Sequence, residues 1–175
     1  MNNRKVLQKI FKKFFHFIFH IFYGRIKLLK DDSDCIINKL AINKITIGNK
    51  EFNLKHLIYE IYDGRIFTDL VEHVAIIKDN FILPDISYQQ VNSELKDVSF
   101  NRVINLGTNR IQKKIKGSVF SLVQGTSGNN YFHFLFDIVV KLRIYEEKHS
   151  LDKVDYFYVP SVESWQKKIL SLFGI

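Results

Sequence analysis

The pattern of hydrophobic and polar residues is clearest near the end of the chain, where it predicts two successive strand–helix units. Residues 117–124 have the length and apolar content of a buried strand, and residues 130–148 contain neither Gly nor Pro and predict a long helix. A second strand is predicted at residues 154–160 and a second helix at residues 161–173, with Ser161 as its N-cap. Strands and helices that alternate with short links are typical of an α/β fold with a parallel sheet.

The centre of the chain contains one clear hairpin pattern. Apolar residues 74–77 and 81–83 are separated by Lys78, Asp79 and Asn80, which are suited to a turn. We therefore expect a β-hairpin at this point.

The remaining segments are less regular. Residues 45–47, followed by Gly-Asn, predict a strand and a turn, but most of residues 36–62 fit a helical period as well as a strand period. Residues 85–100 are polar and predict a long loop with some helix. Residues 103–106 predict a further strand.

The predicted helix at residues 130–148 carries a narrow polar stripe. At about 100° per residue, four polar side chains share this stripe, and almost every other residue of the first three turns is apolar. We expect such a helix to be buried around most of its circumference. Its polar groups must then meet water, a polar partner or a ligand, because burying them unpaired costs free energy. The stripe consists of Asn130, His133, Asp137 and Lys141.

The stripe contains residue types that carry proton-transfer chemistry. His133 can accept or donate a proton near neutral pH, and Asp137 can orient the imidazole or accept a proton itself. The glycine-containing loop 125–130 precedes the helix at the carboxyl end of a predicted strand, where α/β sheets place ligands and where helix N-termini favour anions. In the alternative interpretation, Asp137 pairs with Lys141 and His133 is a hydrogen-bonded core histidine. The spacing alone leaves both interpretations open.

The net charge of +8 belongs entirely to the N-terminal segment. Residues 1–30 contain eight Lys and Arg and no acidic residue, whereas the other 145 residues contain 18 of each sign. Eight of the ten residues between Lys13 and Gly24 are apolar, but a membrane-spanning helix needs about 20 apolar residues. We therefore expect residues 1–30 to form a basic, aromatic, amphipathic helix that lies in the headgroup region of an anionic membrane.

Other interpretations of this segment remain open. The helix can pack on its own domain or on a partner, or it can be a signal peptide, although no suitable cleavage site follows it. Nucleic-acid binding is not expected, because the rest of the chain is neutral and contains no known motif. His16 and His20 are four residues apart, but no third metal ligand is nearby, so we interpret them as polar groups at the membrane interface.

The composition excludes several classes of protein. Apolar residues make up 46% and charged residues 25% of the chain, which argues against wholesale disorder. Cys35 is the only cysteine, so neither an internal disulfide nor a zinc site of several cysteines can form.

The run from Gly128 to Asp137, GNNYFHFLFD, resembles the N-Y-x-H-W-L-x-D signature of glycosyltransferase family 61. This family includes bacterial capsular-polysaccharide transferases, plant xylan-decorating enzymes and protein O-GlcNAc transferases of the secretory pathway. The likeness extends over roughly residues 60–175, including a predicted strand that ends in Val-Pro and a final Leu-Phe-Gly-Ile. Phe134 stands where many members have Trp, which keeps an aromatic ring at that position.

The resemblance implies a fold and an activity. Residues 36–175 would form the Rossmann-like N-terminal lobe of a GT-B enzyme, with a β-rich lead-in. The enzyme would transfer a sugar from a nucleotide-sugar to a glycan or glycolipid acceptor with inversion, in cell-envelope polysaccharide synthesis and without a metal or redox cofactor. His133 or Asp137 would be the base that deprotonates the acceptor. The residues expected to contact the substrates are Gly128, Asn129, Asn130 and Lys141.

A GT-B enzyme also needs a C-terminal lobe that binds the donor, and the resemblance ends at Ile175. We therefore expect a truncated half that is inactive alone, and a separate C-terminal lobe is a candidate partner. Its expected location is the cytoplasm, peripheral on the inner face of the membrane. The alternative is a non-enzymatic remnant of such a lobe that binds a membrane or a partner.

Overall fold

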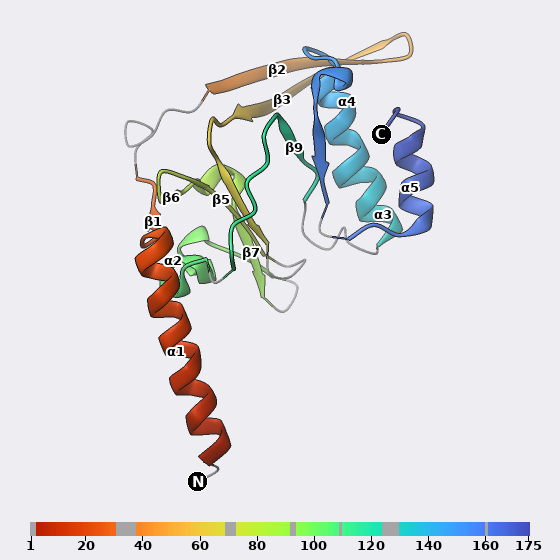
Figure 1. The fold of residues 1–175 in the computed structure, drawn as a ribbon. Helices are drawn as coiled ribbons and strands as arrows, with labels where there is room; N and C mark the ends of the chain where they lie inside the picture. The colour runs from red at the N-terminus through yellow and green to blue at the C-terminus, as the bar shows by residue number, and fades with distance from the viewer. Residues whose placement is uncertain are drawn as a thin grey trace. The chain divides into compact units, whose positions relative to one another are not determined.

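The computed structural model describes residues 3–30, 38–68, 73–91, 94–108, 110–123, 130–159 and 161–175. The chain divides into two compact units, each assembled from segments that are distant in sequence (Figure 1). Unit 1 consists of Met1–Ile36, Asp63–Phe67 and Ala75–Lys114. Unit 2 consists of Ile37–Tyr62, Thr68–Val74 and Ile115–Ile175.

Unit 1 combines a long helix, α1 (Asn3–Tyr23), with a six-stranded sheet and a short helix, α2 (Arg102–Leu106). The strands run in the order β1–β6–β5–β7–β8, and β4 also pairs with β5. The pairing of β1 with β6 is parallel, whereas the β5–β6 and β7–β8 pairs are antiparallel. The strands are β1 (Lys27–Leu28), β4 (Arg65–Thr68), β5 (His73–Lys78), β6 (Phe81–Ile82), β7 (Tyr88–Val91) and β8 (Glu94–Lys96).

The predicted hairpin in the centre of the chain is confirmed as β5 and β6. Ile77 is in register with Ile82, and the two turn residues, Asp79 and Asn80, both have positive φ angles of 49° and 64°. Two-residue turns of this kind match the twist of the flanking strands, and Asp and Asn tolerate the left-handed conformation. The local turn chemistry therefore identified the hairpin correctly.

The strand predicted at residues 103–106 is wrong, because this segment is helix α2. The side chain of Asn101 accepts a hydrogen bond from the Val103 backbone N–H at 3.2 Å, and Gly107 ends the helix with a φ of +67°. An N-cap and a C-terminal glycine satisfy the ends of a short helix. In this segment they outweigh the strand preference of Val103 and Ile104.

The polar stretch expected to be mainly loop contains more structure than predicted. It holds β7 and β8 between two 3₁₀ turns, η2 (Pro84–Ile86) and η3 (Val98–Phe100). Both strands are largely polar and only partly buried, so they lack the apolar pattern that predicts a strand. The core of unit 1 lies elsewhere and contains Ile26, Ala75, Ile77, Ile82 and Val103.

Unit 2 contains a long antiparallel hairpin and a strand–helix segment. The hairpin consists of β2 (Asn38–Ile47) and β3 (Lys50–Glu60), with an irregularity in the register between Ile42 and Lys44. The predicted strand and turn at residues 45–49 are therefore confirmed, and of the ambiguous sequence around them residues 38–44 and 50–60 are also strand.

The strand–helix units predicted near the end of the chain are present in unit 2. Strands β9 (Val119–Ser121) and β10 (Tyr156–Tyr158) pair in parallel, and a continuous helical stretch connects them. This stretch consists of α3 (Tyr131–His133), the π-helical segment η5 (Phe134–Val139) and α4 (Val140–Glu146), and the 3₁₀ turn η6 (Leu151–Lys153) follows it. Helix α5 (Ser164–Ser171) follows β10, and its N-cap is Glu163, in a capping box with Gln166, rather than Ser161.

The fold as a whole is not a Rossmann-like α/β lobe, so the predicted fold class is wrong. Within the described residues, the parallel sheet of unit 2 has two strands, whereas the six-stranded sheet of unit 1 contains antiparallel hairpins. Two strand–helix units predict a larger parallel sheet only if further units lie beside them, whereas most of the other described strands pair with strands close to them in sequence and β1 pairs with the distant β6. The structure is a mixed, strand-rich fold with a few helices.

The described part of the chain contains no helix that is both long enough and apolar enough to cross a membrane.

Candidate active site

The candidate site lies on the helical stretch from Tyr131 to Glu146, whose central six residues are π-helical. In an α-helix, residues four apart are displaced by about 40° around the axis. A π-helical turn, closed by i→i+5 hydrogen bonds, holds more residues and reduces this drift. Side chains four apart therefore stay in straight rows along this helix. π-helical turns are rare, and they are frequent at functional sites.

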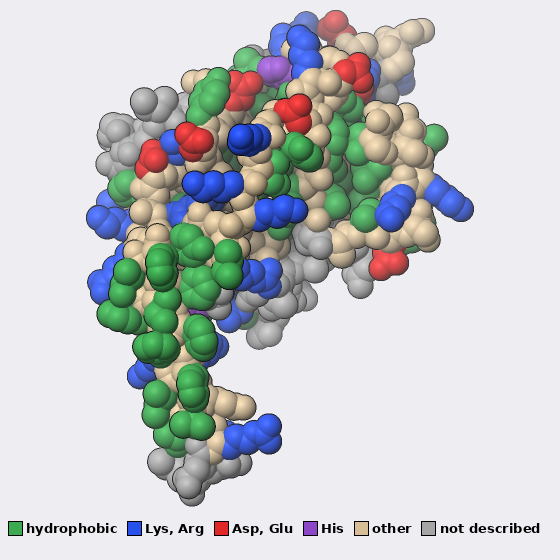
Figure 2. All heavy atoms as spheres, viewed as in Figure 1, with side chains coloured by type: hydrophobic (Ala, Val, Ile, Leu, Met, Phe, Trp, Pro, Cys, Tyr) green, Lys and Arg blue, Asp and Glu red, His purple; other side chains and the backbone are tan. Residues whose placement is uncertain are grey.

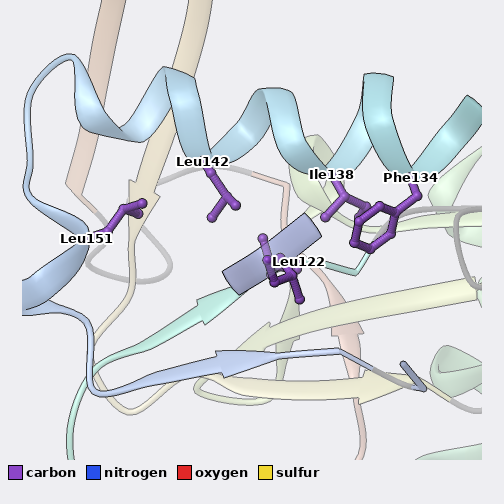
Figure 3. Packing of buried hydrophobic residues seen from close by; sticks show 6 residues of the cluster. Leu122, Phe134, Ile138, Leu142 and Leu151 are labelled. Carbon is purple, nitrogen blue, oxygen red and sulfur yellow. The ribbon is translucent and has the colours of Figure 1, made fainter. Parts of the chain in front are cut away.

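One row is buried and fixes the helix on unit 2. Phe134, Ile138 and Leu142 are each at most 2% exposed, and Figure 3 shows them pointing toward Leu122, directly after β9. Phe134 also contacts the ring of Trp165 on α5 at 5.1 Å between ring centroids. The complete cluster consists of Leu122, Phe134, Ile138, Leu142, Leu151 and Leu170.

A second row is apolar but exposed. Phe132 and Phe136 are more than half exposed and contact each other at 4.6 Å between ring centroids, and Val140 extends the row. The expectation that this helix is buried around most of its circumference is therefore wrong. Hydrophobic periodicity cannot distinguish an apolar row that faces the core from one that faces solvent.

The polar row lies between these two rows and brings two of the predicted residues together. Nδ1 of His133 lies 2.8 Å from Oδ2 of Asp137, and the two side chains are 39% and 34% exposed. A carboxylate can only accept a hydrogen bond, so the bond places the imidazole proton on Nδ1. Nε2 then carries the free lone pair, and it makes no hydrogen bond to the described residues.

Asn130 has a structural role at the start of this helix. Its Oδ1 accepts a hydrogen bond from the His133 backbone N–H at 3.2 Å, in an extended backbone conformation that is typical of an N-cap. The cap fixes the first turn, which carries His133. Asn130 thus positions the histidine, and its exposed side chain remains next to the helix N-terminus.

Lys141 continues the polar row but does not form the predicted pair with Asp137. Its Nζ donates a hydrogen bond to the backbone carbonyl of Val123 at 3.0 Å. Burial lowers the pKa of Lys141 to about 8, and the negative charge of Asp137 partly offsets this shift. The alternative in which Asp137 pairs with Lys141 and His133 lies in the core is therefore not observed. Asp137 pairs with a half-exposed His133 instead.

Gly128 and Asn129, the other two predicted substrate contacts, lie outside the described residues. Their contacts with substrates therefore stay predictions. The hydrogen bond of Lys141 with Val123 is the contact of this lysine that the described residues show.

The hydrogen-bonded pair of His133 and Asp137, here called the dyad, lies next to two aromatic side chains that the sequence pattern did not predict as part of the site. Phe132 lies edge-on to the His133 ring at 5.7 Å between centroids and, with Phe136, forms an exposed aromatic surface beside it. The i, i+4 spacing of Phe132 and Phe136 places them on one face of the helix next to His133. The same spacing is typical of core packing, so it does not by itself identify an exposed surface.

One cavity lined by described residues of unit 2 does not include His133 or Asp137. A cavity of about 340 Å³ lies between the β2–β3 hairpin and the end of α4, and it is lined by Ala41, Lys44, Thr46, Glu147 and Lys148. In the described part of the chain, no group of three or more His, Cys, Asp and Glu side chains is placed to hold a metal ion.

The arrangement of the site permits general base catalysis. A carboxylate orients a neutral imidazole by one nitrogen, and the other nitrogen can accept a proton from a hydroxyl group. The exposed aromatic rings beside it offer an apolar surface for the body of a substrate.

The sequence matches no protein-family model, and no curated protein or solved structure shows significant similarity to the chain. The features of the chain that bear on its function are therefore the geometry of His133 and Asp137 and the resemblance of residues 128–137 to a known signature.

Proposed function

We propose that the chain provides the acceptor-activating dyad of an inverting glycosyltransferase similar to family 61. The observation that carries this proposal is the hydrogen bond between His133 Nδ1 and Asp137 Oδ2, between the His and Asp positions of the signature. The proposal concerns the reaction and the two residues; it does not require a Rossmann-like lobe.

In the proposed reaction, His133 is the catalytic base. Nε2 accepts the proton of an acceptor hydroxyl group while its oxygen attacks the anomeric carbon of the sugar. The new bond from carbon to the acceptor oxygen forms as the bond to the diphosphate oxygen breaks, and the nucleoside diphosphate leaves with the bonding electron pair. Asp137 stabilises the positive charge that develops on the imidazole.

The departing diphosphate needs a positive environment, and two neighbouring features can supply it. The N-terminus of the helix that begins at Tyr131 favours anions, because the backbone N–H groups of a first turn point outward along the helix axis. Lys141 carries a positive charge below its pKa of about 8. Both would stabilise charge that develops in the transition state.

We propose a glycan or glycolipid acceptor at the inner face of the cytoplasmic membrane, in cell-envelope polysaccharide synthesis. Nucleotide-sugars would supply the sugar. The reaction as written uses no metal or redox cofactor.

The decisive experiment changes the native gene in the cells that carry it, so that any partner chain stays present. The variants His133→Ala and Asp137→Asn are compared with a gene deletion by mass spectrometry of the surface glycans. We expect His133→Ala to reproduce the glycan defect of the deletion. Asp137→Asn should reduce the amount of the same product, because Asn can still orient the ring but cannot stabilise its charge.

The matched controls are His56→Ala and Asp152→Asn, which change the same residue types elsewhere in unit 2. Both should leave the glycans unchanged while protein abundance stays at the wild-type level. An unchanged glycan profile in the abundant His133→Ala protein would refute the proposed base. A deletion without any glycan change would instead support a non-enzymatic remnant.

A further inference from the structure

Helix α1 packs on the rest of unit 1 through its polar face. Nδ1 of His16 lies 2.8 Å from the carbonyl oxygen of Leu106, and the ring of His20 lies against Gly107, where a Cβ atom would be 2.9 Å from Cε1. The hydroxyl of Tyr23 accepts a hydrogen bond from the Gln112 backbone N–H at 3.2 Å. The earlier interpretation of the two histidines as interfacial groups is therefore wrong, since they face the protein.

The apolar face of α1 points away from this contact and remains exposed. Its residues recur at the spacing of one helix face and cover about half of the circumference. Figure 2 shows hydrophobic side chains gathered along the helix. The residues at the centre of this face are 56–66% exposed: Ile10, Phe14, Phe17 and Ile21.

This arrangement is the reverse of that expected for a helix that is held on its own domain by the hydrophobic effect. A solvent-exposed face of this size, with several phenylalanines, costs free energy in water and marks a surface that is covered in the working state. The alternative interpretation, a helix that packs on its own domain, is observed for the histidine face of α1, whereas its apolar face stays exposed among the described residues.

The charge of the segment identifies the chemistry of the partner. Arg4, Lys5, Lys9, Lys12 and Lys13 are exposed on α1, three more basic residues follow by Lys30, and residues 1–30 contain no acid. Most of these charges flank the apolar face or lie opposite it, where long side chains can reach the headgroups of a bilayer. An anionic lipid membrane has negatively charged headgroups above an apolar layer, so it is complementary to a helix with basic side chains and an exposed apolar face.

We infer that α1 lies in the plane of an anionic membrane, with Ile10, Phe14, Phe17 and Ile21 at the acyl boundary. The helix has 21 residues, so it is about 30 Å long and makes about six turns along the bilayer surface. Its histidine face contacts the end of α2, at Leu106 and Gly107, on the opposite side of the helix, and unit 1 is therefore held above the bilayer in one orientation. Membrane binding by α1 is independent of the proposed catalytic role of His133 and Asp137, so either can hold without the other.

Flotation of the full chain with lipid vesicles tests this inference. Vesicles of phosphatidylcholine and phosphatidylglycerol in equal parts are compared with vesicles of phosphatidylcholine alone. We expect wild-type protein to float with the anionic vesicles, and the variant Phe14→Ser/Phe17→Ser to bind at least about tenfold more weakly, since each buried side chain contributes to the affinity. Each Lys→Gln change at Lys9, Lys12 or Lys13 should weaken binding about fivefold.

The matched control is Leu95→Ser/Leu172→Ser, which removes two large exposed apolar side chains outside α1 and should float as the wild type does. His16→Ala should also float, because the histidine faces the protein, and circular dichroism confirms that every variant is folded. Wild-type protein that stays unbound, or Phe14→Ser/Phe17→Ser protein that floats equally well, would overturn the inference. Equal binding to both vesicle types would overturn its electrostatic part.

Discussion

Oδ2 of Asp137 lies 2.8 Å from Nδ1 of His133, one turn earlier on the same helix. The carboxylate can only accept this hydrogen bond, so the geometry selects one of the two neutral forms of the imidazole. Nε2 is left as the basic nitrogen of a ring that is 39% exposed.

The first prediction concerns this tautomer. In the wild type at mildly alkaline pH, nitrogen NMR of His133 should show a protonated Nδ1 and an unprotonated Nε2. Asp137→Ala removes the acceptor and should shift the population toward the form protonated on Nε2. Asp152→Ala should leave the His133 signals unchanged. A wild-type ring protonated mainly on Nε2 would contradict the proposed base.

The second prediction concerns the stability contribution of Lys141. Burial lowers the pKa of Lys141 from 10.5 to about 8, so between these values the unfolded state binds more protons than the folded state. The free energy of unfolding should therefore rise with pH across this window, by up to roughly 3 kcal/mol. Urea unfolding at about pH 7.5 and about pH 10 measures the change.

The control for this prediction uses a neighbouring lysine. Lys141→Met should abolish the rise in stability, whereas Lys148→Met, at an exposed position, should retain it. In addition, Asp137→Asn should lower the pKa of Lys141 further, because the carboxylate raises it in the native protein. The same rise in the Lys141→Met protein would show that another group causes it.

The third prediction compares the two apolar rows of the site helix. Ile138 is 2% exposed, whereas Phe136, two residues earlier on the same π-helical segment, is 58% exposed. Ile138→Ala should reduce the free energy of unfolding by about 2–5 kcal/mol, and Phe136→Ala by about 0.5 kcal/mol or less. Chemical denaturation measures both. A similar loss for Phe136→Ala would show that its row is covered in solution.

The fourth prediction concerns the backbone beneath α1. Gly107 has φ +67° and ψ −174°, a region used essentially by glycine, and a Cβ atom there would meet the His20 ring. Gly107→Ala should destabilise the protein by about 3 kcal/mol. Gly48→Ala, at φ +59° with no atom near the added methyl group, should cost about 1 kcal/mol.

Thermal or urea unfolding of both glycine variants gives the comparison. His20→Ala in the Gly107→Ala background should recover part of the loss, because it removes the clash but not the backbone strain. No recovery would assign the whole effect to the backbone of Gly107.

Local signals in the sequence predicted several elements correctly. The Asp79-Asn80 turn defined its hairpin, and the apolar runs around residues 120 and 157 defined the parallel strand pair, because both depend on neighbouring residues only. The same reasoning failed for α2, whose capping residues Asn101 and Gly107 outweigh strand preference. The Rossmann-like fold failed because sheet extension depends on which distant segments become neighbours, and two strand–helix units do not specify this.

The candidate site was predictable in part. Spacing placed His133, Asp137 and Lys141 on one stripe, but it could not decide which partner Asp137 would choose. The partner of Asp137 depends on Val123, because its backbone carbonyl oxygen accepts the hydrogen bond of Lys141. The Asp137 carboxylate then pairs with His133. Similarly, the apolar run and its basic flanks predicted an amphipathic helix at the N-terminus but could not show that His16 would contact Leu106 of the same chain.

The π-helical segment also sets how this helix would respond to a change in its length. A π-helical turn accommodates one residue more than the α-helical turn it replaces, so deletion of Leu135 would let the helix close as an ordinary α-helix. Residues on either side of the deletion would keep facing the same way, and the contacts of Leu142 would survive. The spacing between the imidazole and its carboxylate would change from four residues to three. Residues three apart on an α-helix are also neighbours, so the deletion should keep the pairing of His133 with Asp137 as well as the buried row. The π-helical turn therefore marks a position at which this helix can lose one residue without losing its site.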